Sequence, residues 1–275
     1  MSPSLPDDLE PGPLAAALEG AALGESREVV AVAESTMDLA WAARDRGAPH
    51  GHLVLADAQT AGRGSYGRRW TSPGGQDLYL SVLLRPRGTT PRPPAAHLGM
   101  LAQAGGLAGA EVAEAAGVAT RVKWPNDVVV ARATPGKLAG VLVEARAPAG
   151  TTAPDLVVGI GLNVGRESFR TFDGAHLPAT SLRLEGSRWK RLEALRALLD
   201  GLAKQLQRLR REGAGSTARR VEARLWARGE GVQLTVEGQA PVACTLLGLA
   251  PDGALRVAVD GETHTLRSGR LDSEG

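Results

Sequence analysis

The chain changes character near residue 228, and this change constrains the fold more than any other feature of the sequence. Before it, short apolar runs rich in β-branched residues recur at 29–32, 53–56, 78–84, 128–130, 138–143 and 156–160. Most of them are apolar throughout, which is typical of strands in a sheet that helices cover. After residue 228 the apolar runs lie at 232–236, 242–249, 255–259 and 264–266, with turn signals between them. The sequence therefore predicts an α+β domain followed by a small β-barrel or sandwich.

Helical patterns alternate with the apolar runs of the first part. The clearest covers residues 188–212, where leucines recur at steps of three and four while arginines and lysines fill the outer face. Another follows Ser35, a residue type that caps helices, and ends at Gly47. A third pattern, rich in glycine, indicates a helix packed closely on the sheet. We expect helices at 36–46, 96–116, 188–212 and 216–227.

These patterns divide the chain into three parts. Residues 1–27 are rich in Pro, Ala and Gly and are expected to be a lead-in with a short helix around Leu14–Leu18. Residues 28–228 form the main domain and residues 229–275 the small one. The lead-in is too short to be a DNA-binding domain.

Composition restricts the class of protein. With 275 residues, 43% of them hydrophobic, the chain can bury a sizeable core. A single cysteine, Cys244, excludes an intrachain disulfide and favours a reducing compartment. No apolar run reaches the roughly 20 residues that span a bilayer, and the chain starts acidic and proline-rich rather than like a signal peptide. We expect a cytoplasmic protein without a membrane partner.

Residues 62–70 form a loop of glycines and arginines that ends in Trp70. Gly62, Gly64 and Gly67 allow backbone N–H groups to approach an anion, and arginines such as Arg68 offer a fork of donors to it. A solvated basic turn and a nucleic-acid-binding tract are the alternatives. We expect the loop to become ordered, and protected from proteases, when a ligand binds.

Four further segments carry polar groups that suit a binding site. Ser35 and Thr36 open a helix, where hydroxyls and free N–H groups bind small polar groups, although simple helix capping explains them too. Gln59 ends a predicted strand, and its amide can both donate and accept. The remaining two segments, at 123–127 and 136–140, and the stretch 159–163 beyond them contribute the groups Lys123, Asn126, Asp127, Lys137, Gly140, Gly159, Gly161 and Asn163.

Among these groups, Lys137 is the best candidate for a catalytic charge, because a lysine that starts a buried strand is unstable unless it meets an anion. Residues 136–140 do not form a P-loop, since Leu138 stands where the Mg²⁺-binding Ser or Thr would be. Lys123 is suited to neutralising phosphate and Asp127 to binding a ligand or Mg²⁺, and a plain Pro-Asn-Asp turn is the alternative. Glycines inside the strand at 156–160 and just after it indicate close approach by a ligand or another chain.

The order of these motifs closely resembles that of biotin–protein ligases. The resemblance covers residues 28–165 and runs through Glu-Ser-Thr, Gln-Thr-Ala-Gly-Arg-Gly, Lys-Trp-Pro-Asn-Asp, Lys-Leu-Ala-Gly-Val and Gly-Ile-Gly-Leu-Asn. It implies a mixed sheet flanked by helices, like that of class II aminoacyl-tRNA synthetases, followed by an SH3-like barrel. It also implies two reaction steps: biotin and ATP form biotinoyl-AMP with Mg²⁺, and a lysine of a biotin carboxyl carrier domain then takes the biotinoyl group.

The resemblance also assigns roles to residues. Lys137 and Arg63 would be catalytic, and Asp127 would act near the phosphates and the metal. Biotin would be bound by Ser35, Thr36, Gln59, Gly62, Arg63, Gly140 and Gly159. The nucleotide would be bound by Gly64, Gly67, Arg68, Trp70, Lys123, Asn126, Asp127 and Asn163.

Two positions depart from the family pattern. Many relatives have arginine where this loop has Ser65, and asparagine where this chain has Met37. Ser65 removes one possible loop contact to biotinoyl-AMP. The segment 268–271 matches the usual ending of the family only loosely, so we assign no ATP contact there.

Further expectations concern partners and rival functions. The partner would be the carrier domain of acetyl-CoA carboxylase or a related carboxylase, with no DNA partner because no winged helix-turn-helix precedes residue 28, and the protein would be a monomer or weak homodimer. A lipoate or octanoate ligase or transferase of the same fold is the nearest rival. A nucleic-acid-binding module that uses the Gly/Arg loop is the rival from another class, but it leaves Lys137 unexplained.

Overall fold

Two β-sheets organise the computed structural model, which describes residues 4–85, 98–147, 154–169 and 177–273. The strands of the first are β1 Arg27–Ala33, β2 His52–Gln59, β3 Leu78–Leu84, β4 Thr120–Lys123, β5 Asp127–Val130, β6 Lys137–Arg146 and β7 Asp155–Leu162. Those of the second are β8 Gly231–Thr235, β9 Val242–Leu249, β10 Leu255–Val259, β11 Glu262–Leu266 and β12 Arg270–Ser273. All the predicted strands are confirmed, and β4 and β12 were missed.

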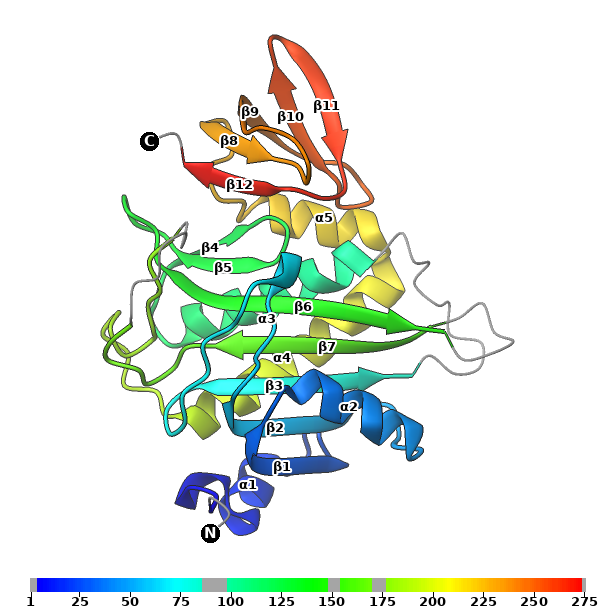
Figure 1. Ribbon diagram of the computed structural model, residues 1–275, viewed down its shortest axis with the longest axis vertical. Coiled ribbons are helices and arrows are strands. Elements are labelled where there is room, and N and C mark those ends of the chain that lie inside the picture. Colours follow the sequence, from blue (N-terminus) through cyan, green and yellow to red (C-terminus); the bar gives the residue numbers. More distant parts are fainter. Residues whose placement is uncertain (1–3, 86–97, 148–153, 170–176, 274–275) are drawn as a thin grey trace.

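The first sheet is mixed and the second antiparallel. The seven strands lie in the order β1-β2-β3-β7-β6-β5-β4, and only β1 and β2 are parallel neighbours. The five strands of the second sheet follow the order β11-β10-β9-β8-β12 and lie at one end of the molecule, beyond β4 and β5 (Figure 1). The predicted mixed α+β architecture is confirmed. The SH3-like barrel and the boundary at residue 228 stay predictions.

The helices are α1 Pro11–Ala17, α2 Thr36–Asp45, α3 Leu98–Ala115, α4 Arg191–Glu212 and α5 Ala214–Glu222, with short 3-10 turns at η1 Asp7–Leu9 and η2 Ser65–Gly67. Residues 96–97 of the helix predicted at 96–116 lie outside the described residues. The helix predicted at 216–227 starts and ends earlier than expected. It stops because the next residues pair with β4: Val122 N donates to Arg224 O at 2.9 Å, and Trp226 N donates to Val122 O at 3.0 Å.

Helices cover both faces of the first sheet, as the apolar strands predict. Val54 of β2 packs with Met37 and Trp41 of α2, whereas its neighbours Leu53 and Leu55 join the main core on the opposite face. Helix α3 lies on that opposite face and α4 packs against it. The glycines of α3 allow a close fit, because a Cβ at Gly105 would lie 2.8 Å from Val141 Cγ1. The expected close packing is confirmed.

The N-terminal segment is integrated into this core. Leu9, Leu14 and Leu18 are buried. Arg191 at the start of α4 donates from Nε to Asp8 Oδ2 at 2.8 Å and from Nη1 to Asp57 Oδ1 at 2.5 Å. Residues 8 to 18 therefore pack as part of the main domain. Within the described ranges, no helix is long and apolar enough to cross a membrane.

Candidate active site

A cavity of about 970 Å³ lies where the loop between β2 and β3 crosses β6 and β7. Its lining includes every residue that the sequence assigned to the site except Gly62 and Gly67. Those two line a smaller cavity together with Leu142 and Glu144. The fold thus gathers residues that lie more than a hundred positions apart.

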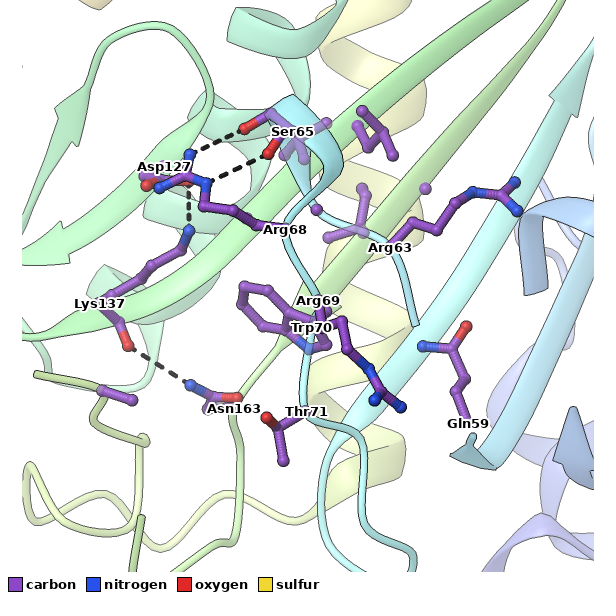
Figure 2. A pocket seen from close by; sticks show the side chains of 18 of the residues that line it. Gln59, Arg63, Ser65, Arg68, Arg69, Trp70, Thr71, Asp127, Lys137 and Asn163 are labelled. Carbon is purple, nitrogen blue, oxygen red and sulfur yellow. Dashed lines mark hydrogen bonds and ion pairs between the residues drawn. The ribbon is translucent and has the colours of Figure 1, made fainter. Parts of the chain in front are cut away.

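The loop at 62–70 is a narrow hairpin over this cavity. Gly64 N donates to Arg68 O at 2.7 Å and Trp70 N donates to Gly62 O at 2.8 Å. Gly62 is required by this packing, because a Cβ there would lie 2.6 Å from Trp70 O. The side chain of Arg63 is held by Asp38 at 2.7 Å and by Glu144 at 3.2 Å. Its guanidinium is thus directed away from Lys137 (Figure 2).

Trp70 divides the site into two ends (Figure 2). Its indole packs on glycines of β6 and β7: a Cβ at Gly140 would lie 2.9 Å from Trp70 Cζ3, and one at Gly161 would overlap the ring. At Gly159 a Cβ would lie 3.0 Å from Met37 Sδ. The close approach that these glycines indicate is therefore made by side chains of the same chain.

One end of the site is neutral and polar. Gln59 Oε1 accepts from Thr36 N at 2.8 Å and from Thr36 Oγ1 at 3.2 Å, while Gln59 Nε2 donates to Ser72 Oγ at 2.9 Å. The hydroxyl of Thr36 also bonds Ser81 Oγ at 2.8 Å. Ser35 caps α2 by accepting from the N–H of Met37 at 3.3 Å. The network fixes the orientation of the Gln59 amide.

The other end is charged. Lys137 Nζ lies 2.8 Å from Asp127 Oδ1 and 5.2 Å from the centre of the Trp70 ring, and its side chain is 25% exposed. The carbonyl of Lys137 accepts from Asn163 Nδ2 at 3.4 Å (Figure 2). Arg68 also lines this end, where it donates from Nε to Ser65 O at 3.1 Å and from Nη2 to Ser65 Oγ at 3.1 Å. Two cations and one carboxylate therefore meet around a space next to Trp70.

Lys123 adds a third, buried cation. Its side chain is 5% exposed, and its Nζ lies 5.6 Å from the Trp226 ring. Burial lowers the pKa of Lys123, and the carboxylates of Asp127 and Asp272 act in the opposite direction. Because a buried ammonium is stabilised by an anion, this position is suited to one of the phosphates of a nucleotide.

The two asparagines of the site bond the protein backbone. Asn126 Nδ2 donates to Val141 O at 2.6 Å, and Asn163 Nδ2 donates to Thr180 O at 2.8 Å. Asn126 thus bonds the middle of β6, and Asn163, which directly follows β7, bonds the segment at Thr180. Their oxygens are the groups through which they would meet a ligand.

Sequence reasoning missed two groups of polar residues. Ser72 and Ser81 complete the polar network, and Ser81 is detectable as the one small polar side chain among the aliphatic and aromatic residues of β3. Asp77 and Arg166 form a second group: Arg166 Nε donates to Asp77 Oδ2 at 2.7 Å and Arg166 Nη2 to Tyr79 Oη at 2.8 Å. Burial raises the pKa of Tyr79, so its phenol stays protonated. This group lies beside the cavity and supports the segment after β7.

Known proteins resemble this chain in the sequence of its first part and in the fold of most of its length. Residues 29–163 match the biotin/lipoate A/B protein ligase family. The bifunctional ligase/repressor BirA of Bacillus spizizenii is 37% identical over 151 residues, which cover 55% of this chain and 44% of that protein. The biotin--[acetyl-CoA-carboxylase] ligase of Mycobacterium tuberculosis is 40% identical over 118 residues, which cover 42% of this chain and 40% of that protein.

A solved structure matches over more of the chain. The biotin protein ligase from Aquifex aeolicus in complex with biotin and ATP is 27% identical, with a TM-score of 0.72, and the match covers 90% of this chain and 98% of that one. The chain spans less than half the length of the two curated relatives described above.

Proposed function

We propose that this protein is a biotin–protein ligase, which activates biotin with ATP and transfers it to a lysine of a carrier protein. One observation carries the proposal: a single cavity has a neutral polar end at Thr36 and Gln59 and a cationic end at Lys137, with Trp70 between them. A reaction that joins the carboxylate of a molecule with an uncharged polar head group to a phosphate needs both ends in one site.

The neutral end suits the ureido group of biotin. Thr36, Gln59 and Ser35 offer hydroxyl and amide groups, and the backbone of Arg63 lines the same cavity. Leu142 and Ile160 supply apolar wall for the bicyclic ring. We assign Gly62, Gly140 and Gly159 to the surrounding wall.

The charged end suits the first chemical step. An oxygen of the biotin carboxylate attacks the α-phosphorus of ATP, and pyrophosphate leaves with the bonding electrons. Negative charge grows on the phosphate oxygens during this step, and Lys137 stabilises it. Lys123 and Arg68 bind phosphate oxygens, while Trp70, Asn126 and Asn163, together with Gly64 and Gly67, position the nucleotide.

Mg²⁺ enters as part of the ATP substrate. Among the described residues, no group of three His, Cys, Asp or Glu side chains is placed to hold a metal ion. Among the described residues that line the cavity, Asp127 is the one Asp or Glu, so it is the one side-chain carboxylate available to a metal there, and its Oδ1 lies 2.8 Å from Lys137 Nζ. We therefore propose that the phosphates hold Mg²⁺, with Asp127 as the protein group nearest to it.

The second step transfers the biotinoyl group. The amine of an acceptor lysine attacks the acyl carbon of biotinoyl-AMP, and AMP leaves. The similarity to a biotin--[acetyl-CoA-carboxylase] ligase supports the carrier domain of acetyl-CoA carboxylase or a related carboxylase as the acceptor. We also propose that the second sheet is an SH3-like barrel, that residues 28–228 form the catalytic domain, and that the protein acts in the cytoplasm as a monomer or weak homodimer.

Calorimetric titration with biotin, lipoate and octanoate tests the substrate class. We expect heat only with biotin, and pyrophosphate release only when biotin and MgATP are both present. Binding of lipoate or octanoate in place of biotin would instead assign the chain to the other branch of the same family. Binding of nucleic acid without biotin would contradict both assignments.

A further inference from the structure

Tyr66, at the tip of the 62–70 hairpin, has an unusual conformation. Its φ of 59° and ψ of 38° are left-handed, a region that bulky side chains rarely adopt. Its ring is large, and 49% of the residue is exposed. A strained and half-exposed tyrosine keeps this conformation only where other contacts stabilise it.

Those contacts come from the C-terminal sheet. Tyr66 Oη donates to Gly269 O at 3.0 Å and accepts from Gly269 N at 2.9 Å, across 203 positions of sequence. A phenol can donate once and accept, and here it does both to one residue. The hairpin is therefore bonded directly to the backbone that enters β12.

Gly269 is itself fixed in place. Its φ is +144°, and a Cβ there would lie 3.2 Å from Leu234 Cδ1 and 3.3 Å from Thr235 O, both on β8. The next residue, Arg270, pairs with Thr235 in the second sheet. The carbonyl and the N–H of Gly269 that bond Tyr66 thus belong to a segment that the hydrogen bonds between β12 and β8 hold in place.

Arg68 of the hairpin connects the Tyr66 contact with the charged end of the cavity. Arg68 lies with Cζ 5.8 Å from the Tyr66 ring, and its guanidinium is directed to Ser65 on the side where Lys137 and Asp127 meet (Figure 2). Trp70, two positions further, packs on the first sheet. Besides the ion pairs of Arg63, the hairpin is therefore anchored by Trp70 on the first sheet and by Tyr66 on the second.

We propose that Tyr66 is a positioning residue for nucleotide binding, and that its two hydrogen bonds to Gly269 make the C-terminal sheet hold the 62–70 hairpin over the cavity. This inference rests on the proposed function, since it names the group that places Arg68 against the phosphates. Loss of the bonds lowers the fraction of hairpins that cover the cavity. The apparent affinity for ATP falls in proportion to that fraction, while molecules whose hairpin covers the cavity react at the same rate as before.

The substitution Tyr66→Phe tests this inference, because it keeps the ring beside Arg68 and removes only the hydroxyl. We expect the KM for ATP in pyrophosphate release to rise about five- to tenfold, with kcat changed less than about twofold. Hydrogen exchange of the amides at 62–70 should become faster in the free protein, with an unchanged thermal midpoint. The control on the C-terminal sheet is Val242→Ala, at an exposed position of β9. Its KM, kcat and hydrogen exchange should match those of the wild type.

A double-mutant cycle tests whether Tyr66 acts on the KM for ATP through Gly269. Gly269→Ala disturbs the same bond from the other side, so Tyr66→Phe should add little to it. Unchanged KM and unchanged exchange in Tyr66→Phe, a fall confined to kcat, or full additivity of the two substitutions would overturn the inference. If the wild-type protein releases no pyrophosphate, the proposed function fails, but the exchange measurement still decides whether Tyr66 holds the hairpin.

Discussion

Lys137 is the residue on which the proposed reaction depends most. Its ammonium has two neighbours, the carboxylate of Asp127 and the face of Trp70, and both orient it toward the same space. The ion pair with Asp127 holds the ammonium in place. In the proposed reaction, Lys137 is thus a preorganised cation at the point where phosphate charge develops.

Lys137→Ala should reduce pyrophosphate release by about a hundred- to a thousandfold, since it removes this charge from the transition state. Steady-state release with saturating biotin and ATP measures the effect. Lys204→Ala is a matched control, because Lys204 is half-exposed on α4 and only loosely paired with Glu111 at 3.7 Å. Normal release by Lys137→Ala with an intact fold would remove Lys137 from the mechanism.

At the scale of the element, helix α3 shows how small residues set the spacing between layers. Its buried face carries Gly105, Gly106 and Gly109 toward the sheet, and Gly105 meets the side chain of Val141 on β6. Glycine weakens a helix, so its use here reflects the need for close approach. Because β6 also carries Lys137 and Gly140, this packing supports the floor of the cavity.

Gly105→Ala should lower the free energy of unfolding by about 1–3 kcal/mol, because its Cβ would overlap Val141. Gly99→Ala in the same helix has no atom within 4 Å of the new Cβ and should raise it by about 0.5 kcal/mol. Urea denaturation of the two variants measures the difference. Equal effects would mean that helix propensity, rather than packing on β6, governs both positions.

At the scale of the whole molecule, long-range contacts join segments from both ends of the chain to the main sheet. Arg191 binds the N-terminal segment to β2 through Asp8 and Asp57, with a side chain that is only 4% exposed. Trp124 donates from Nε1 to Gly253 O at 3.2 Å, and Gln103 donates from Nε2 to the same oxygen at 2.8 Å. These bonds fix the second sheet against the first.

Arg191→Ala should lower the free energy of unfolding by about 3 kcal/mol, because it leaves the buried part of the ion pair uncompensated. Arg267→Ala is the control: Arg267 also pairs with an aspartate, Asp252, at 2.5 Å, but its side chain is 70% exposed. The Arg267→Ala substitution should lower the free energy of unfolding by less than about 1 kcal/mol. Chemical denaturation measures the free energy of unfolding of both variants. A similar small decrease in both would show that the N-terminal segment contributes little to stability.

The sequence by itself determined the strands other than β4 and β12, most of the helices, and many of the residues that line the cavity. Apolar runs such as Leu78–Leu84 and the leucine period of α4 are local patterns, and local patterns follow directly from the geometry of a strand or a helix. The motif order also singled out Lys137, Gln59 and Trp70. Strands β4 and β12 were not predicted because each has only four residues and mixes polar with apolar side chains.

Only the tertiary structure decided which of these residues meet. The packing of Trp70 on Gly140, the early end of α5 at β4, and the bonds of Tyr66 to Gly269 all depend on strand order and register. A sequence motif records residue types and their spacing along the chain, whereas these contacts join positions that the folding of two sheets brings together. For this reason close approach at Gly159 and Gly161 of β7 was expected, but from a ligand or another chain, whereas the side chains of Met37 and Trp70 make it.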